Sequence, residues 1–502
     1  MFSGNTHRSL TLNPWTLTER LLPIAPALGW LSMHRRIKSI DACLAQARAS
    51  HLRRSLGPLQ LGALGVGAIV GTGIFVLTAI GAERAGPALM LSFVIAAAVC
   101  ALAALAYAEL AAMIPISGSA YTYSYAIFGE LAAWLVGWNL ILEYAAAAGA
   151  VAVGWSGYIL GLLRTWGVDF PVYLRAGMFA SHAGGVNLVA VGIVTVVTTL
   201  LVIGTRTSAA VTSALVAIKL TALLAFLLVT LPMLNLQNFT PFMPFGFGST
   251  EVSGTVKGVM AAASLIFMAY LGFDTVSTAA EETKNPNRNV PLGILGSLAA
   301  CSLIYVLVAA GAIGTTPYQR LIGNTEPLAW ILRNLGHPTL GNLVGLAAVV
   351  ALPSVLLMLL FGQSRIFFSM ARDGLLPRAL SRVHPRLHTP HVMTIITGAA
   401  VALLAAFFSV QEIAELSNTG TLFAFVAVGL GVLRLRSTEP LRPRPFRCPA
   451  IWLVAPGAIA GCSYLFLSLS SRTQMRFLCW TLIGVAVYLL YGFRRSPLRG
   501  DA

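Results

Sequence analysis

Apolar stretches recur along almost the whole chain and are separated by short polar connections. Each stretch approaches the roughly 20 residues that an α-helix needs to cross a bilayer at about 1.5 Å per residue. The pattern therefore predicts an all-α polytopic membrane protein. Its twelve transmembrane helices are expected at residues 59–82, 87–114, 124–161, 186–205, 208–232, 255–279, 291–315, 340–369, 391–409, 413–435, 450–471 and 475–493.

The first predicted span contains an unusual concentration of glycine, at Gly65, Gly67, Gly71 and Gly73. Glycine weakens a helix, and an unpaired backbone group is expensive in hydrocarbon unless it faces protein, water or a ligand. We therefore predict a break in the helix at 71–73, whose free N–H groups would favour an anion such as a carboxylate. A glycine-rich face for close helix packing explains the same pattern equally well.

The sixth predicted span carries a second interruption, because Gly272 lies in its middle and Asp274 follows almost at once. A carboxylate at this depth is expensive unless it faces the protein interior. Interrupted segments in spans one and six indicate a five-plus-five inverted repeat with two discontinuous helices and a site between them.

Composition supports the membrane class, and charge orients the chain. Of the 502 residues, 57% are hydrophobic and 10% are charged, with a mean hydropathy of +0.80. The net charge of +16 would also fit a nucleic-acid partner, but the predicted connections place 24 of the 33 Lys and Arg residues on the cytoplasmic side and 8 outside. The positive-inside rule explains this distribution. We expect a multi-pass protein of the cell's inner membrane, with both termini cytoplasmic and no nucleic-acid partner.

Residues for catalysis or metal binding form no recognisable pattern in the sequence. The six cysteines are dispersed, and neither an HExxH motif nor a Gly-x-Ser-x-Gly motif occurs. A channel would favour rings of charge or repeated filter loops, which are also absent from the sequence. We expect no enzyme, no catalytic residue, no metal site and no cofactor, with a channel or an intramembrane enzyme as minor alternatives.

Six motifs resemble those of bacterial members of the cationic amino acid transporter family, within the amino acid–polyamine–organocation superfamily. The resemblance covers about residues 55–495. Its motifs are Gly67-Ala-Ile-Val-Gly-Thr-Gly-Ile-Phe75, Ile116-Ser-Gly-Ser-Ala-Tyr-Thr-Tyr123, Gly137-Trp-Asn-Leu-Ile-Leu-Glu-Tyr144, Tyr270-Leu-Gly-Phe-Asp-Thr-Val-Ser-Thr-Ala-Ala-Glu-Glu282, Arg372-Asp-Gly-Leu-Leu-Pro377 and Asn418-Thr-Gly-Thr-Leu-Phe-Ala-Phe425.

The resemblance implies a permease that takes up an amino acid together with a proton. It also implies a ten-helix core followed by two peripheral helices. On this basis we divide the chain into a cytoplasmic tail, a transport core, two C-terminal transmembrane helices and a second cytoplasmic tail, at residues 1–57, 58–436, 437–495 and 496–502.

The resemblance further assigns backbone groups to the substrate. N–H groups around the first break, with one hydroxyl, are implied to hold the carboxylate, at Ile69, Gly71, Thr72 and Gly73. Carbonyl groups at the second break are implied to hold the ammonium, at Met268, Ala269 and Leu271. Span eight is implied to floor the side-chain pocket from Met358 to Leu360, which are apolar, so we expect small to medium neutral side chains to bind better than arginine.

Glu143 and Asp274 are the two further candidates for the transport pathway. Glu143 could line the pathway or pair with a cation from a neighbouring helix. Asp274 could contact substrate or hydrogen-bond the free backbone of its own broken helix. Bacterial relatives often carry Asp where this chain has Asn139, and this departure places a strictly cationic substrate in doubt.

Lys219 is the one cation predicted in the middle of a span, about eleven residues from either end. Its side chain cannot reach either interface from there, since the distance is roughly 16 Å at 1.5 Å per residue. The ammonium must be paired, face water or lose its proton. The resemblance places this position near the broken first helix, where sodium-coupled relatives of the fold bind an ion. We therefore predict that Lys219 couples transport to protons by bonding carbonyls near Gly67 and Ala68, with a fixed ion pair to Glu143 or Asp274 as the alternative.

Other carriers of the same fold remain open as alternatives. An amino acid exchanger and a polyamine or sodium-coupled carrier would both satisfy the sequence pattern. Backbone groups that bind the α-amino and α-carboxyl groups do not contact the side chain, so the motifs do not identify the amino acid. The motifs also leave open whether an accessory subunit exists.

Overall fold

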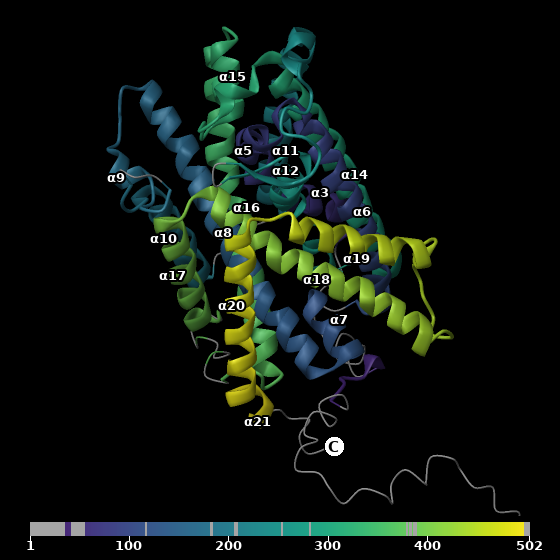
Figure 1. The fold of residues 1–502 in the computed structure, drawn as a ribbon. Helices are drawn as coiled ribbons and strands as arrows, with labels where there is room; N and C mark the ends of the chain where they lie inside the picture. The colour runs from purple at the N-terminus through teal and green to yellow at the C-terminus, as the bar shows by residue number, and fades with distance from the viewer. Residues whose placement is uncertain are drawn as a thin grey trace, which may run out of the picture.

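The computed structural model describes residues 36–41, 56–115, 118–180, 184–204, 209–252, 255–280, 283–377, 380, 384 and 389–495. The predicted C-terminal tail, 496–502, lies outside the described residues. So does the predicted N-terminal tail, 1–57, apart from 36–41 and 56–57. The structure is a bundle of long helices with one short β-hairpin (Figure 1).

The first half of the chain forms the helices α3 (Pro58–Ile69), α4 (Thr72–Phe75), α5 (Leu77–Ala85), α6 (Leu89–Met113), α7 (Ser119–Phe128), α8 (Glu130–Thr165), α9 (Val172–Arg175), α10 (Leu188–Ile203) and α11 (Ala209–Thr230). The second half forms the hairpin β1 (Thr250–Val252) and β2 (Thr255–Lys257), then α12 (Val259–Ile266), the 3₁₀ turn η4 (Phe267–Tyr270), α13 (Thr275–Thr278), α14 (Pro286–Thr315), α15 (Pro327–Asn334), α16 (Pro338–Arg372), α17 (His391–Phe407), α18 (Val410–Thr438), α19 (Ile451–Leu467), α20 (Ser471–Val487) and α21 (Phe493–Arg495).

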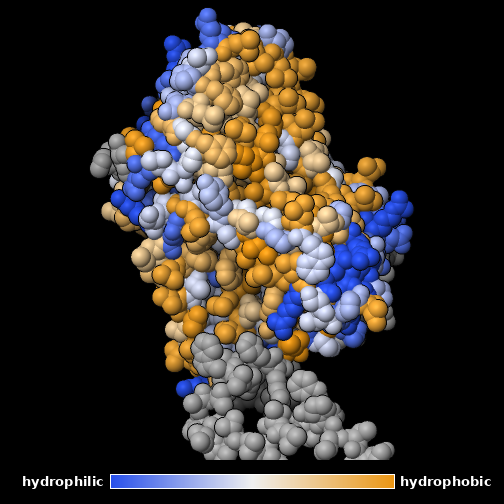
Figure 2. All heavy atoms as spheres, turned by 45° about the vertical axis from the view of Figure 1, so that its right-hand side comes forward, coloured by the Kyte–Doolittle hydropathy of each residue, from blue (hydrophilic) through white to orange (hydrophobic). Residues whose placement is uncertain are grey.

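The surface and the helix lengths confirm a multi-pass α-helical membrane protein. Eight stretches of the described chain are long and apolar enough to cross a bilayer, and four shorter apolar helices accompany them, namely α3, α10, α17 and α19. Hydrophobic side chains cover much of the visible face in Figure 2, and hydrophilic ones gather towards its edges. The count of twelve spans and the inverted repeat stay predictions.

Two predicted spans begin later than the sequence pattern indicated. The third was expected from residue 124, but Gly129, with φ of +93°, separates α7 from α8. A side chain at Gly129 would also stand 3.1 Å from the carbonyl oxygen of Arg36, which packs against this corner. The sixth was expected from residue 255, but residues 255–257 pair with 250–252 in the β-hairpin and α12 begins at Val259. Hydropathy along the sequence does not show where α7 ends and α8 begins, or where the hairpin ends and α12 begins.

Two charged residues in or beside the first two predicted spans are buried in ion pairs. Arg84, which follows the first predicted span, is 1% exposed and pairs with Glu415 of α18. Glu109 of α6 is 1% exposed and lies 2.6 Å from Arg436 and 3.2 Å from Arg444. Both pairs join segments distant in the chain, which a local reading of hydropathy does not detect.

Both predicted helix breaks are present. The first lies between α3 and α4, where Gly71 adopts φ of −149° and ψ of −148°. The second lies between η4 and α13, where Gly272 adopts φ of +115°, a conformation that favours glycine. The two breaks cross closely: a side-chain carbon on Gly73 would stand 2.2 Å from the Cα of Ala269, and one on Gly272 would stand 2.8 Å from the carbonyl carbon of Ala68. The glycines of the first span therefore serve both roles that the sequence suggested: they break the helix, and they allow close packing between helices.

The two glycines of the first break differ in the space around them, and this difference is testable. We expect Gly73→Ala to lower the melting temperature of the purified protein by several degrees, because overpacking a rigid backbone contact costs about 1–3 kcal/mol. Gly71→Ala is the matched control, since its methyl group would meet Val355 Cγ1 at 3.4 Å, an ordinary contact. Equal melting temperatures for the two variants in a fluorescence-detected thermal unfolding assay would contradict this packing.

Candidate functional site

A small cavity lies where the two broken helices meet α8 and α16. Its volume is about 40 Å³. It is lined by Ala68, Ile69, Gly71, Thr72, Gly73, Ala147, Val151, Met268, Leu271, Gly272, Thr275, Val355, Met358 and Leu359. The site thus forms from four segments that are far apart in the sequence.

Seven of the expected substrate residues line this cavity, namely Ile69, Gly71, Thr72, Gly73, Met268, Leu271 and Met358. Two others do not. Ala269 is buried against Gly73, and Leu360 is buried while Leu359 takes its place in the lining. Helical geometry explains the second correction, because Val355, Met358 and Leu359 fall on one face of α16 and the next residue turns away from it.

Four lining residues were not anticipated from the sequence, namely Ala147, Val151, Thr275 and Val355. Ala147 and Val151 lie one turn apart on α8, and Val355 lies one turn before Met358 on α16. The i, i+4 spacing from Glu143 through Ala147 to Val151 was the available signal, since these positions share one helix face. It is a weak signal, because alanine and valine occur throughout the spans.

The first break presents hydrogen-bond donors to the cavity. The initial N–H groups of a helix have no partner within that helix, so the start of α4 at Thr72 favours an anion. The Thr72 hydroxyl is buried and has no hydrogen-bond partner among the described residues. An unmet buried hydroxyl is unusual, and a ligand oxygen in the cavity would satisfy it.

The second break presents carbonyl groups. Asn418 of α18 donates to the carbonyl oxygens of Ser264 and Leu265 at 2.7 and 2.8 Å, which satisfies the end of α12. The Met268 carbonyl accepts the N–H of Leu271 at 3.1 Å and keeps a second lone pair. Carbonyl oxygens beyond the end of α12 suit an ammonium group.

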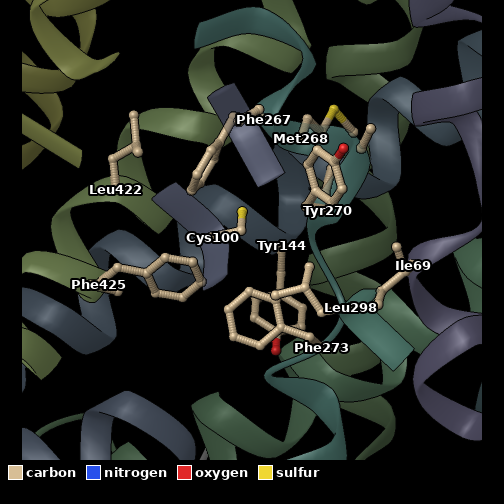
Figure 3. Close-up of a cluster of buried hydrophobic side chains, with 14 of the residues drawn as sticks. Ile69, Cys100, Tyr144, Phe267, Met268, Tyr270, Phe273, Leu298, Leu422 and Phe425 are labelled. Atoms are coloured by element: carbon tan, nitrogen blue, oxygen red, sulfur yellow. The ribbon is translucent and has the colours of Figure 1, made fainter. Parts of the chain in front are cut away.

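Apart from Thr275 of α13, the rest of the lining is apolar, with Ala147, Val151, Val355, Met358 and Leu359 contributed by α8 and α16. Glu143 and Asp274 are buried but lie outside the lining. The Asp274 carboxylate accepts a hydrogen bond of 3.4 Å from Tyr144. Figure 3 shows Tyr144 beside Phe273, apart from Met268 and Tyr270. The wall that would face a substrate side chain therefore carries no charge.

Lys219 lies on α11 behind the first break. Its side chain is 1% exposed, and Nζ donates to the carbonyl oxygen of Gly67 at 3.0 Å. Among the described residues, Lys219 forms no ion pair with Glu143 or Asp274. The contact lies at a carbonyl freed by the break, as the position of this lysine in the sequence led us to expect.

Comparison with known proteins agrees with this architecture. Residues 56–489 match the family described as amino acid permease. The chain is 44% identical to the branched-chain amino acid permease BcaP of Bacillus subtilis, over 92% of this chain and 98% of that one. It is 39% identical to the methylthioribose transporter of the same organism, over 92% of this chain and 98% of that one. It is 36% identical to human cationic amino acid transporter 4, over 85% of this chain and 67% of the human one.

Breaks in two membrane helices, a cavity between them and a family match over most of the chain lead to one conclusion. This chain belongs to the amino acid permease family, within the amino acid–polyamine–organocation superfamily.

Proposed function

We propose that this permease imports a neutral aliphatic amino acid across the cell's inner membrane by proton symport. The observation that carries the proposal is the cavity, whose lining combines residues of both helix breaks with a wall of α8 and α16 side chains that carries no charge. Two relatives at 44% and 33% identity are named branched-chain amino acid permeases, which supports this substrate class.

In this proposal the substrate backbone lies between the two breaks. The carboxylate accepts hydrogen bonds from N–H groups at Gly71, Thr72 and Gly73 and from the Thr72 hydroxyl. The ammonium donates to the carbonyls of Met268 and Leu271, while Ala269 is left out because it packs against Gly73. Helix dipoles favour this orientation, since N–H ends attract anions and carbonyl ends attract cations. The substrate side chain then faces α8 and α16.

The ligand preference tests this function directly. In a thermal-shift screen of the purified protein we expect leucine, isoleucine and valine to raise the melting temperature more than arginine, because the side-chain wall offers an arginine no counter-charge. Methylthioribose belongs in the same screen, since one relative bears that name. Arginine or methylthioribose as the strongest ligand would contradict the proposed substrate class.

The proposal also includes the topology of twelve spans, with a five-plus-five repeat in 58–436 and two peripheral helices in 437–495. The breaks in the first and sixth predicted spans support the repeat, and the excess of cations in the predicted inner connections supports cytoplasmic termini.

Reporter fusions test this orientation. A tag at residue 40 and a tag after residue 495 should both report from the cytoplasm, because an even number of spans returns the chain to its starting side. Opposite locations for the two tags would show that a span has been misplaced.

Lys219 is the residue that we propose for proton coupling. When protonated, it bonds the Gly67 carbonyl and steadies the first break. Release of its proton towards the cytoplasm removes the charge from that contact and loosens the substrate site. Glu143 and Asp274 remain candidates for the proton pathway, because both are buried close to the site without an ion pair among the described residues.

Substitution of Lys219 tests the coupling. We expect Lys219→Ala to abolish accumulation of substrate driven by an imposed pH difference in proteoliposomes, and Lys219→Arg not to restore it, because arginine keeps its proton. Lys257→Ala is the control, since that lysine lies over the Phe245 ring in the hairpin region. Concentrative uptake by Lys219→Ala would show that the coupling site lies elsewhere. Uptake by wild type that does not respond to external acidification would favour an exchanger.

A further inference from the structure

Tyr305 of α14 touches the first break directly. Its side chain is 0% exposed, and its hydroxyl donates to the carbonyl oxygen of Ile69 at 2.8 Å. Ile69 is the last residue of α3 and lines the cavity. A carbonyl at the end of a membrane helix has no partner within the helix, so this hydroxyl supplies the bond that the break removes.

The bond fixes the peptide unit between Ile69 and Val70, just before the break at Gly71. The Ile69 carbonyl and the Val70 N–H belong to the same planar peptide group. Tyr305 holds its oxygen, and the Val66 carbonyl accepts the Val70 N–H at 2.8 Å. Both polar groups of this unit are therefore held, and Gly71 is the next residue along the chain.

The ring of Tyr305 packs against the second break. Its centroid lies 5.4 Å from that of Tyr270, which belongs to η4, and 5.8 Å from that of Phe93 on α6. The Tyr270 hydroxyl donates instead to the Phe93 carbonyl at 2.9 Å, away from the first break. Figure 3 shows Tyr270 next to Met268, whose carbonyl is a proposed ammonium ligand.

We propose that Tyr305 is a positioning residue that sets the spacing between the two halves of the substrate site. Its hydroxyl fixes the carboxylate end through Ile69, and its ring fixes the ammonium end through Tyr270. The inference rests on the proposed function, because it presumes an α-amino acid spanning both breaks. Without the hydroxyl, the backbone at the first break is no longer held in one conformation. Substrate binding must then order this backbone, which weakens the affinity for substrate.

Tyr305→Phe tests this role, because it keeps the ring and removes only the hydroxyl. Tyr488→Phe is a matched control: the same atom is lost from an equally buried ring, but from a bond to Glu130, and neither residue lines the cavity. Binding of leucine to the purified proteins is measured by radioligand competition, and their melting temperatures are measured without ligand. We expect leucine to bind Tyr305→Phe about tenfold more weakly, the effect of one lost buried hydrogen bond, with the ligand-free melting temperature within about 3 °C of wild type.

Leucinol, which lacks the carboxylate, provides a readout specific to the site. Because Tyr305 orders the carboxylate end, Tyr305→Phe should reduce the preference for leucine over leucinol, whereas Tyr488→Phe should keep the wild-type preference. An unchanged leucine affinity and preference in Tyr305→Phe would overturn the inference. A large loss of ligand-free stability in Tyr305→Phe would also overturn it, because the hydroxyl would then support the whole fold. Failure of wild type to bind leucine would contradict the proposed function itself.

Discussion

A backbone carbonyl or N–H group inside a bilayer has no water to bond, so a membrane helix that stops halfway must find other partners for its ends. This constraint organises the centre of the protein. The Gly67 carbonyl is bonded by Lys219, the Ile69 carbonyl by Tyr305, and the carbonyls at the end of α12 by Asn418. Residues of both breaks, among them Gly71, Thr72 and Met268, line the cavity. In the proposed function, the substrate satisfies backbone groups that helix breakage leaves free.

The same logic applies to charge. Two buried ion pairs join helices that are distant in the sequence. They are Arg84 with Glu415 and Glu109 with Arg436. Removing one member of such a pair would leave an uncompensated buried charge, which is far more expensive than the pair itself. Lys219 differs, because its partner is a neutral carbonyl. A lysine without a fixed counter-ion is suited to gain and lose a proton.

Much of the site followed from the sequence, because its elements have strong local signals. A glycine cluster marked the first break, Gly272 with Asp274 marked the second, and Lys219 was conspicuous as a cation in an apolar run. The side-chain wall was only partly anticipated. Met358 was expected and lines the cavity, but the α16 face also presents Val355 and Leu359 and turns Leu360 away. Which face of a buried helix points inward depends on its packed rotation, and a helix that is apolar all round carries no pattern that reveals it.

The sequence by itself determined the membrane class, the position of both helix breaks and the isolation of Lys219, because bilayer thickness and backbone hydrogen bonding act on short local stretches. Tertiary structure decided the partners. Tyr305 reaches a carbonyl 236 positions away, and Arg84 reaches a carboxylate 331 positions away. Such contacts depend on how whole helices cross, and no pattern within one helix specifies which residue of another will lie opposite its freed or charged groups.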